Sequence, residues 1–113
     1  MLKTGIDLVH VAQIKKMVGN EAALKRLLHR TELHNPGTNR VEHIAGIVAA
    51  KEAFFKALGS VPRWLDVEIV YEKNGKPRLK YSGILKQKIK EADVSISHDK
   101  DYAVASVVLI LNK

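Results

Sequence analysis

The residues best suited to chemistry are two acids and a base, which lie in two distant segments of the chain. Glu52 and Lys56, which follow Lys51, stand four residues apart, a spacing that places both on one face of a helix. Asp7 lies in an apolar segment, where a carboxylate either faces water or is held by a cation. If Asp7 and Glu52 converge, two carboxylates with phosphate oxygens and water would form an octahedral Mg²⁺ site. The alternatives are a solvated Glu52–Lys56 ion pair and an Asp7 that faces solvent.

A histidine and two serines near the end of the sequence form a second candidate group. His98 follows the apolar-alternating segment 94–97, and a histidine at the end of a strand can act as a base near neutral pH. Ser95 and Ser97 could face a cleft. A turn role for His98 and solvent exposure of both serines are the alternatives. The sequence suggests no Ser-His-acid triad and no glycine-rich phosphate loop.

The segment Asn74-Gly75-Lys76-Pro77 predicts a hairpin turn, because Asn-Gly is a strong signal for a two-residue turn. Lys76 could also reach a phosphate, although the turn accounts for the segment without it.

Strands and helices must bring these groups together, and hydrophobic periodicity predicts the order β-α-α-β-β-α-β-β. Asn20 is expected to cap a helix within the first helical region, and Gly59 to end the longest helix. The pattern indicates α+β, as a single domain over residues 1–113 with a mainly antiparallel sheet. Strands are expected at residues 4–11, 66–72, 78–81, 94–97 and 102–111, and helices within 12–30 and at 41–58 and 84–90.

The composition narrows the function classes. The 113 residues contain no cysteine, which excludes a disulfide framework, a thiolate zinc site and a cysteine nucleophile. A net charge of +7 favours an anionic partner such as nucleic acid, acidic lipid, a phosphorylated cofactor or an acidic protein. Because the sequence has no targeting segment and no membrane-spanning run, we expect a cytoplasmic protein with no membrane partner.

Four segments resemble, in order and spacing, the holo-acyl-carrier-protein synthases, the small bacterial members of the phosphopantetheinyl transferase superfamily. They are GIDLVHV, AAKEAFFKALG, DVEIVYEKNGKPRL and VSISHDKDYAVASVVL, and the resemblance extends over nearly the whole chain. The resemblance implies the fold of that superfamily and a homotrimer with active sites at the subunit interfaces. It also implies Mg²⁺-dependent transfer of 4′-phosphopantetheine from coenzyme A to a serine of an acyl carrier protein, with release of 3′,5′-ADP and no nucleic-acid partner.

The resemblance also assigns roles to individual residues. Asp7 and Glu52 match the Mg²⁺ ligands of the family, and Lys56 matches a lysine that contacts the cofactor's phosphates. These three are the expected catalytic residues, and either Glu52 or a metal-bound water would take the proton of the carrier serine. The cofactor-binding residues expected besides Lys56 are Gly75, Lys76, Pro77, Ser97 and His98. The basic face expected to dock the carrier comprises Lys15, Lys16, Lys25, Arg26 and Arg30.

The chain departs from the family pattern at His10, Gln13, Ile47, Phe55 and the loop Ser60–Trp64. At these positions, taken in the same order, the family often has an acidic residue, an arginine, a second arginine, a serine and a glycine-rich loop. Two further hypotheses therefore stay open. One is a relative that binds coenzyme A without activity. The other is a basic α+β domain that holds nucleic acid through charges such as the lysines of residues 86–90.

Overall fold

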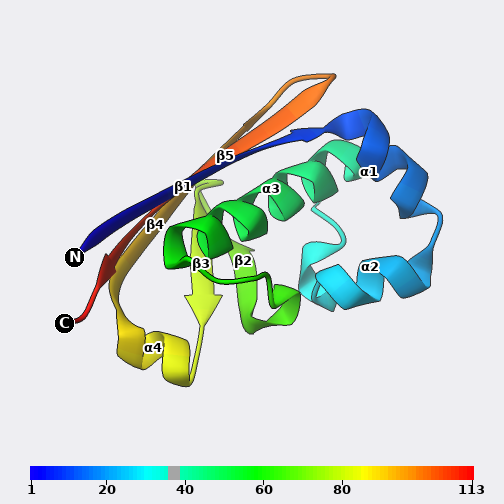
Figure 1. The fold of residues 1–113 in the computed structure, drawn as a ribbon. Coiled ribbons are helices and arrows are strands. Elements are labelled where there is room, and N and C mark those ends of the chain that lie inside the picture. Colours follow the sequence, from blue (N-terminus) through cyan, green and yellow to red (C-terminus); the bar gives the residue numbers. More distant parts are fainter. Residues whose placement is uncertain (36–38) are drawn as a thin grey trace.

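The computed structural model describes residues 1–35 and 39–113 (Figure 1). The predicted α+β class is confirmed, and every strand pairing is antiparallel. Two short 3₁₀ turns, η1 (Arg30–Glu32) and η2 (Trp64–Asp66), lie on either side of the longest helix. The remaining elements are β1 (Leu2–His10), α1 (Val11–Val18), α2 (Glu21–Leu27), α3 (Arg40–Leu58), β2 (Val67–Tyr71), β3 (Pro77–Tyr81), α4 (Ile84–Lys88), β4 (Ile89–His98) and β5 (Tyr102–Leu111).

A three-stranded sheet in the order β1-β5-β4 forms one layer, and α3 packs along one of its faces (Figure 1). Side chains alternate across each strand, so that in β1 Gly5, Asp7 and Val9 are buried toward α3, while Ile6 and Leu8 point to the opposite face. That outer face is exposed. A separate hairpin of β2 and β3 lies beyond α3, and β3 contacts β4.

Helix α3 is the element that organises the core. Its N-cap is Asn39, whose side chain accepts a hydrogen bond from the Glu42 amide at 3.1 Å. The helix ends at Gly59, which adopts the left-handed conformation with φ 78° as the sequence predicts. Most side chains between these ends are buried, because α3 packs against the three-stranded sheet and also contacts α1 and β2. No helix among the described residues is long and apolar enough to cross a membrane.

The close approach of β1 to α3 depends on Gly5. A Cβ atom at this position would lie 2.0 Å from the Ala53 carbonyl oxygen and 2.7 Å from the Ala57 nitrogen. Only a residue without a side chain lets the strand and the helix come this near. The strand therefore lies against the helix at a distance that short side chains can bridge.

The structure corrects the sequence prediction at β4. This strand runs from Ile89 to His98, whereas the prediction began it at residue 94 and continued the preceding helix to residue 90. Glu91 and Asp93 obscure the apolar alternation, and the register with β5 shifts between Ile89 and Glu91. The Asn20 cap is confirmed, since its side chain accepts a hydrogen bond from the Ala23 amide at 3.1 Å.

Candidate active site

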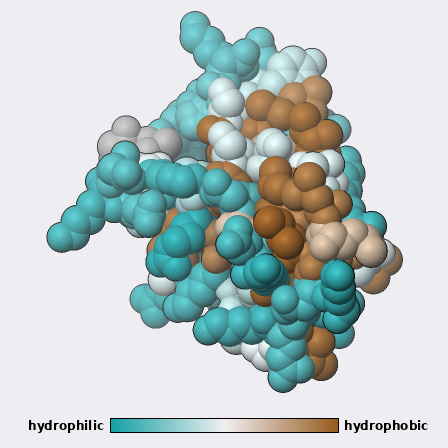
Figure 2. Space-filling view, turned by 90° about the vertical axis from the view of Figure 1, so that its left-hand side faces the viewer, coloured by the Kyte–Doolittle hydropathy of each residue, from teal (hydrophilic) through white to brown (hydrophobic). Residues whose placement is uncertain are grey.

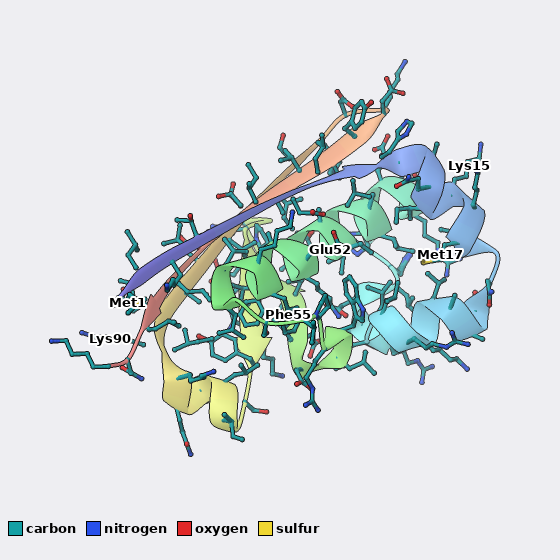
Figure 3. All side chains as sticks on the ribbon, viewed as in Figure 1. Met1, Lys15, Met17, Glu52, Phe55 and Lys90 are labelled. Carbon is teal, nitrogen blue, oxygen red and sulfur yellow. The ribbon has the colours of Figure 1, made fainter. Side chains whose placement is uncertain are left out.

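Two of the predicted residues on α3 meet the aspartate of β1. The Lys56 ammonium donates to Asp7 Oδ1 at 2.9 Å and to the Ile6 carbonyl oxygen at 3.1 Å. Asp7 is only 8% exposed, which excludes the alternative that it faces solvent and leaves the one in which a cation holds it. Glu52 lies one helical turn before Lys56, and Figure 3 labels it on α3 close to β1. The alternative of a simple Glu52–Lys56 surface pair gives way to a three-residue arrangement with Asp7 at its centre.

The two carboxylates perturb each other. The pKa of Glu52 is raised from 4.5 to about 7, chiefly because burial disfavours its charged form, and further by hydrogen bonding to Asp7 and by the negative charge of Asp7. The positive charge of Lys56 acts in the opposite direction on Glu52. Asp7 in turn raises the pKa of Lys56. When Glu52 is ionised as well as Asp7, the cluster carries more negative charge than the single Lys56 ammonium neutralises.

An unsatisfied oxygen indicates where a further cation would bind. Asp7 Oδ2 is buried and has no hydrogen-bond partner among the residues that the structure describes. Glu52 can donate to Asp7 only when it is protonated, so this oxygen has no donor once Glu52 is ionised. A buried carboxylate oxygen without a partner is costly unless a ligand satisfies it. Asp7 and Glu52 could thus hold a divalent cation.

The donor set fits a cation that takes most of its ligands from elsewhere. Within residues 1–35 and 39–113, no group of three or more His, Cys, Asp or Glu side chains could hold a metal. Mg²⁺ in particular is usually bound through one or two carboxylates, with water and substrate phosphates completing the octahedron. His10 does not add a ligand, because it lies on the outer face of the sheet and stacks on Tyr102 with ring centroids 4.9 Å apart.

Two other predicted cofactor-binding residues, Ser97 and His98, lie at the opposite edge of the three-stranded sheet from Asp7. His98 and Ser97 belong to β4, whereas Asp7 belongs to β1, and these two strands form the two edges. Strands lie about 4.8 Å apart, so the edges are separated by about 10 Å. Within one chain, His98 and Ser97 therefore do not join Asp7, Glu52 and Lys56.

The side chains of this second group have contacts of their own. The Lys76 ammonium donates to Asp93 Oδ1 on β4 at 2.9 Å, which ties the Gly75–Pro77 turn to that strand. His98 Nδ1 lies 3.7 Å from Glu42 Oε2, near the start of α3. Ser97 is exposed, as its solvent-facing alternative predicts.

Two large cavities, both formed by residues within 1–35 and 39–113, do not contain the acidic cluster. One cavity of about 550 Å³ lies between η1 and the hairpin of β2 and β3. Another of about 510 Å³ lies between the end of α3 and α4. Neither is lined by Asp7, Glu52 or Lys56. Of the Asp7–Lys56 pair, the Lys56 side chain is the part that solvent reaches, at 59% exposure against 9% for Asp7.

A buried ion pair next to Glu52 escaped the sequence analysis. Lys51 and Glu32 are both completely buried, with 2.7 Å between Nζ and Oε1. The Lys51 ammonium also donates to the carbonyl oxygens of Leu27 and Trp64, at 2.8 and 2.9 Å. Burial lowers the pKa of Lys51, and Glu32 opposes that shift. The one sequence signal is a lysine among the small apolar residues of AAKEA, and a charged residue there suggests a buried partner only once the helix packing is known.

The remaining predicted positions fall into two environments. Ile47 and Phe55, which depart from the family pattern, are core residues at 0% and 2% exposure. Phe55 packs edge-on against Phe54 with ring centroids 5.1 Å apart. The basic residues predicted to dock a carrier are all exposed, on α1, α2 and η1: Lys15, Lys16, Lys25, Arg26 and Arg30.

Comparison with known proteins is consistent across sequence and structure. The family model described as "4'-phosphopantetheinyl transferase superfamily" matches residues 3–107. The holo-[acyl-carrier-protein] synthase of Nautilia profundicola is 43% identical, over 94% of this chain and 97% of the relative. The corresponding Geobacter sulfurreducens protein is 41% identical, over 94% of both chains.

Solved structures of the same kind share the fold. The holo-(acyl-carrier-protein) synthase of Bacillus anthracis, solved in complex with CoA (3',5'-ADP), superposes with a TM-score of 0.80 at 35% identity, over 98% of this chain and 96% of that one. The synthase of Neisseria meningitidis superposes with a TM-score of 0.84 at 29% identity, over 96% and 97%.

Proposed function

The chain belongs to the 4′-phosphopantetheinyl transferase superfamily, and from this premise we propose that it transfers 4′-phosphopantetheine from coenzyme A to a serine of an acyl carrier protein. The relatives named holo-[acyl-carrier-protein] synthase support the assignment. The observation that carries it is the meeting of Asp7 on β1 with Glu52 and Lys56 on α3, since these are the positions that match the catalytic residues of the family.

The chemistry is a phosphoryl transfer. The serine oxygen forms a bond to the phosphorus that bears the pantetheine arm, the bond from that phosphorus to the bridging oxygen breaks, and 3′,5′-ADP leaves with the electron pair. Mg²⁺, held by Asp7 and Glu52, would neutralise the diphosphate and polarise the phosphorus. Lys56 stabilises negative charge that develops on the phosphoryl oxygens. Glu52, which lies on α3 beside Asp7, is the candidate on this chain for taking the serine proton.

A homotrimer would complete the site. The predicted cofactor residues divide between the β1 and β4 edges of one sheet, so a β4 edge from a second copy could supply Gly75–Pro77 and His98 to the first copy's Asp7. The exposed outer face of the sheet supports assembly, and Figure 2 shows hydrophobic residues gathered in a band on the side where the chain begins and ends. Large apolar residues exposed on this face are Leu2, Ile6, Leu8, Tyr102 and Val108.

Assembly can be tested independently of chemistry. Size-exclusion chromatography with light scattering should give three times the 12.6 kDa chain mass. Leu8→Asp, which puts a charge on the exposed apolar face, should give monomers and remove transferase activity. A fully active monomer would contradict the shared-site part of the proposal.

The carrier is expected to dock through charge. Acyl carrier proteins are strongly acidic, and the exposed basic side chains of α1, α2 and η1 offer the complementary surface. Raising the salt concentration should therefore weaken carrier binding, whereas salt-independent binding would argue against this docking face.

Mass spectrometry of the carrier tests the reaction itself. Incubation of an apo carrier protein with the enzyme, coenzyme A and Mg²⁺ should add the mass of the phosphopantetheine arm. Glu52→Gln should abolish the addition, and Glu91→Gln, an exposed control on β4, should leave it unchanged. No mass gain with the wild-type chain would favour an inactive relative that still binds coenzyme A. Near-normal turnover of Glu52→Gln would remove Glu52 from the mechanism.

A further inference from the structure

The acidic pair is occupied by a cation from the chain itself. Lys56 Nζ lies 2.9 Å from Asp7 Oδ1, and its second contact is the Ile6 carbonyl oxygen at 3.1 Å. These are the hydrogen bonds of an ammonium that has settled against a carboxylate. Lys56 thus stands where the negative charge of the cluster is greatest.

The two partners differ in how firmly they are held. The Asp7 side chain is 9% exposed and fixed between β1 and α3, whereas the Lys56 side chain is 59% exposed. A lysine on a flexible four-carbon stem can leave such a contact without disturbing the core. The Asp7 carboxylate is therefore held in place by the fold, whereas the Lys56 ammonium can leave it.

A divalent cation and this ammonium would oppose each other. Both would be attracted by Asp7, one at Oδ1 and the other at the partnerless Oδ2 or across to Glu52. Like charges at such short range repel even in water. The same residue that favours an anionic substrate therefore disfavours the metal as long as no phosphate is bound.

We propose that Lys56 is the resident counter-ion of the acidic pair in the metal-free protein, and that it competes with the divalent cation for this pair. The inference rests on the proposed metal site and adds the order in which the metal and the diphosphate bind. Metal loading displaces the ammonium from Asp7, and the released ammonium is then available to the diphosphate. Metal binding in this way prepares the cluster for its anionic substrate.

Removal of the ammonium should therefore tighten metal binding. The repulsion between two unit positive charges about 4 Å apart in water weakens binding of one of them by about fivefold. A divalent cation carries twice the charge, so the repulsion energy is doubled. Salt and the mobility of the lysine reduce the effect, so Lys56→Met should bind the metal about tenfold more tightly.

A metal titration without coenzyme A tests this directly. Mn²⁺ serves as the probe, and electron paramagnetic resonance of the free ion gives the affinity at pH 8 for the wild-type chain, Lys56→Met and Lys3→Met. Lys3 is the matched control because it lies on the same strand, four residues or about 13 Å from Asp7, which exceeds the screening length of about 10 Å. It should change the affinity by less than about twofold. Thermal melts verify that each variant is folded.

Each outcome has one meaning. Tighter binding by Lys56→Met alone supports the competition. Equal or weaker binding by Lys56→Met overturns it and makes Lys56 a residue that holds Asp7 in place for the metal. An equal gain in Mn²⁺ affinity for Lys56→Met and Lys3→Met overturns it as well, because the gain would then come from the lower net positive charge of the protein. If neither the wild-type chain nor any variant binds Mn²⁺, the inference and the metal part of the proposed function both fail.

Discussion

Replacing Gly5 with alanine should separate β1 from α3 and pull apart the reactive cluster. The added Cβ would lie 2.0 Å from the Ala53 carbonyl oxygen, and contacts below 3.0 Å are essentially never seen, so the strand must move by about 1 Å. The blocking atoms belong to the helix backbone and cannot rotate away. Overpacking of this kind costs about 1 to 3 kcal/mol of stability.

The displacement should cost more in rate than in stability. Asp7 lies two residues from Gly5 on the same face of β1, so it moves away from Glu52 with the strand. A misplacement of about 1 Å at a reacting centre can lower the rate by about 100-fold. Urea unfolding and the carrier mass assay, run on the same preparation, separate the two effects.

Gly19→Ala is the matched control. Gly19 has an ordinary φ of −75°, and an added Cβ there would meet no atom within 4 Å, so this variant should match the wild-type protein within about 0.5 kcal/mol and retain full activity. A Gly5→Ala protein with wild-type stability and rate would refute the reasoning, because β1 could then not be held against α3 by the absence of a side chain.

Three further predictions concern stability. Folding favours protonated Glu52, so the metal-free protein should become less stable as pH rises from 4.5 to about 7. A full shift of the Glu52 pKa would change the unfolding free energy by about 3 kcal/mol, and partial exposure of Glu52 reduces this change to about 1 to 2 kcal/mol. Glu52→Gln should make the unfolding free energy nearly independent of pH in this range. An unchanged pH dependence would contradict the assignment. Lys51→Met leaves Glu32 buried without its cation and should cost about 3 to 5 kcal/mol in urea unfolding, most of it restored by adding Glu32→Gln; no restoration would show that the loss comes from packing. Asn39→Ala removes the cap of α3 and should lower stability by about 1 kcal/mol in the same assay, and a neutral result would mean that the cap is replaced by water.

Local sequence signals predicted much of the fold. The C-terminal end of α3 follows from the apolar run that stops at Gly59, and the hairpin of β2 and β3 follows from Asn74-Gly75. The start of β4 was missed because Glu91 and Asp93 interrupt the apolar alternation on an edge strand. Local signals fail where a strand is exposed on one side and irregular in register.

The candidate site was less accessible to sequence reasoning. That Glu52 and Lys56 share a face follows from helix geometry, but their contact with Asp7 depends on which face of β1 meets α3. The alternation of side chains along β1 allows either face of the strand to meet α3. The apolar residues Ile6 and Leu8 suggest that their own face is the buried one, but they lie on the exposed face. The resemblance to the family supplied the expectation that the chain's own periodicity could not.

The three contacts of the Lys51 ammonium join segments that are far apart in the sequence. One buried cation links the last residue of α2, the acid of η1 and the first residue of η2 to the centre of α3. The helix that carries Lys25 and Arg26 is thereby anchored to the helix that carries Glu52 and Lys56. If a carrier docks on α2 as proposed, this anchor would set the distance from the docked carrier to the acidic cluster without a closing movement.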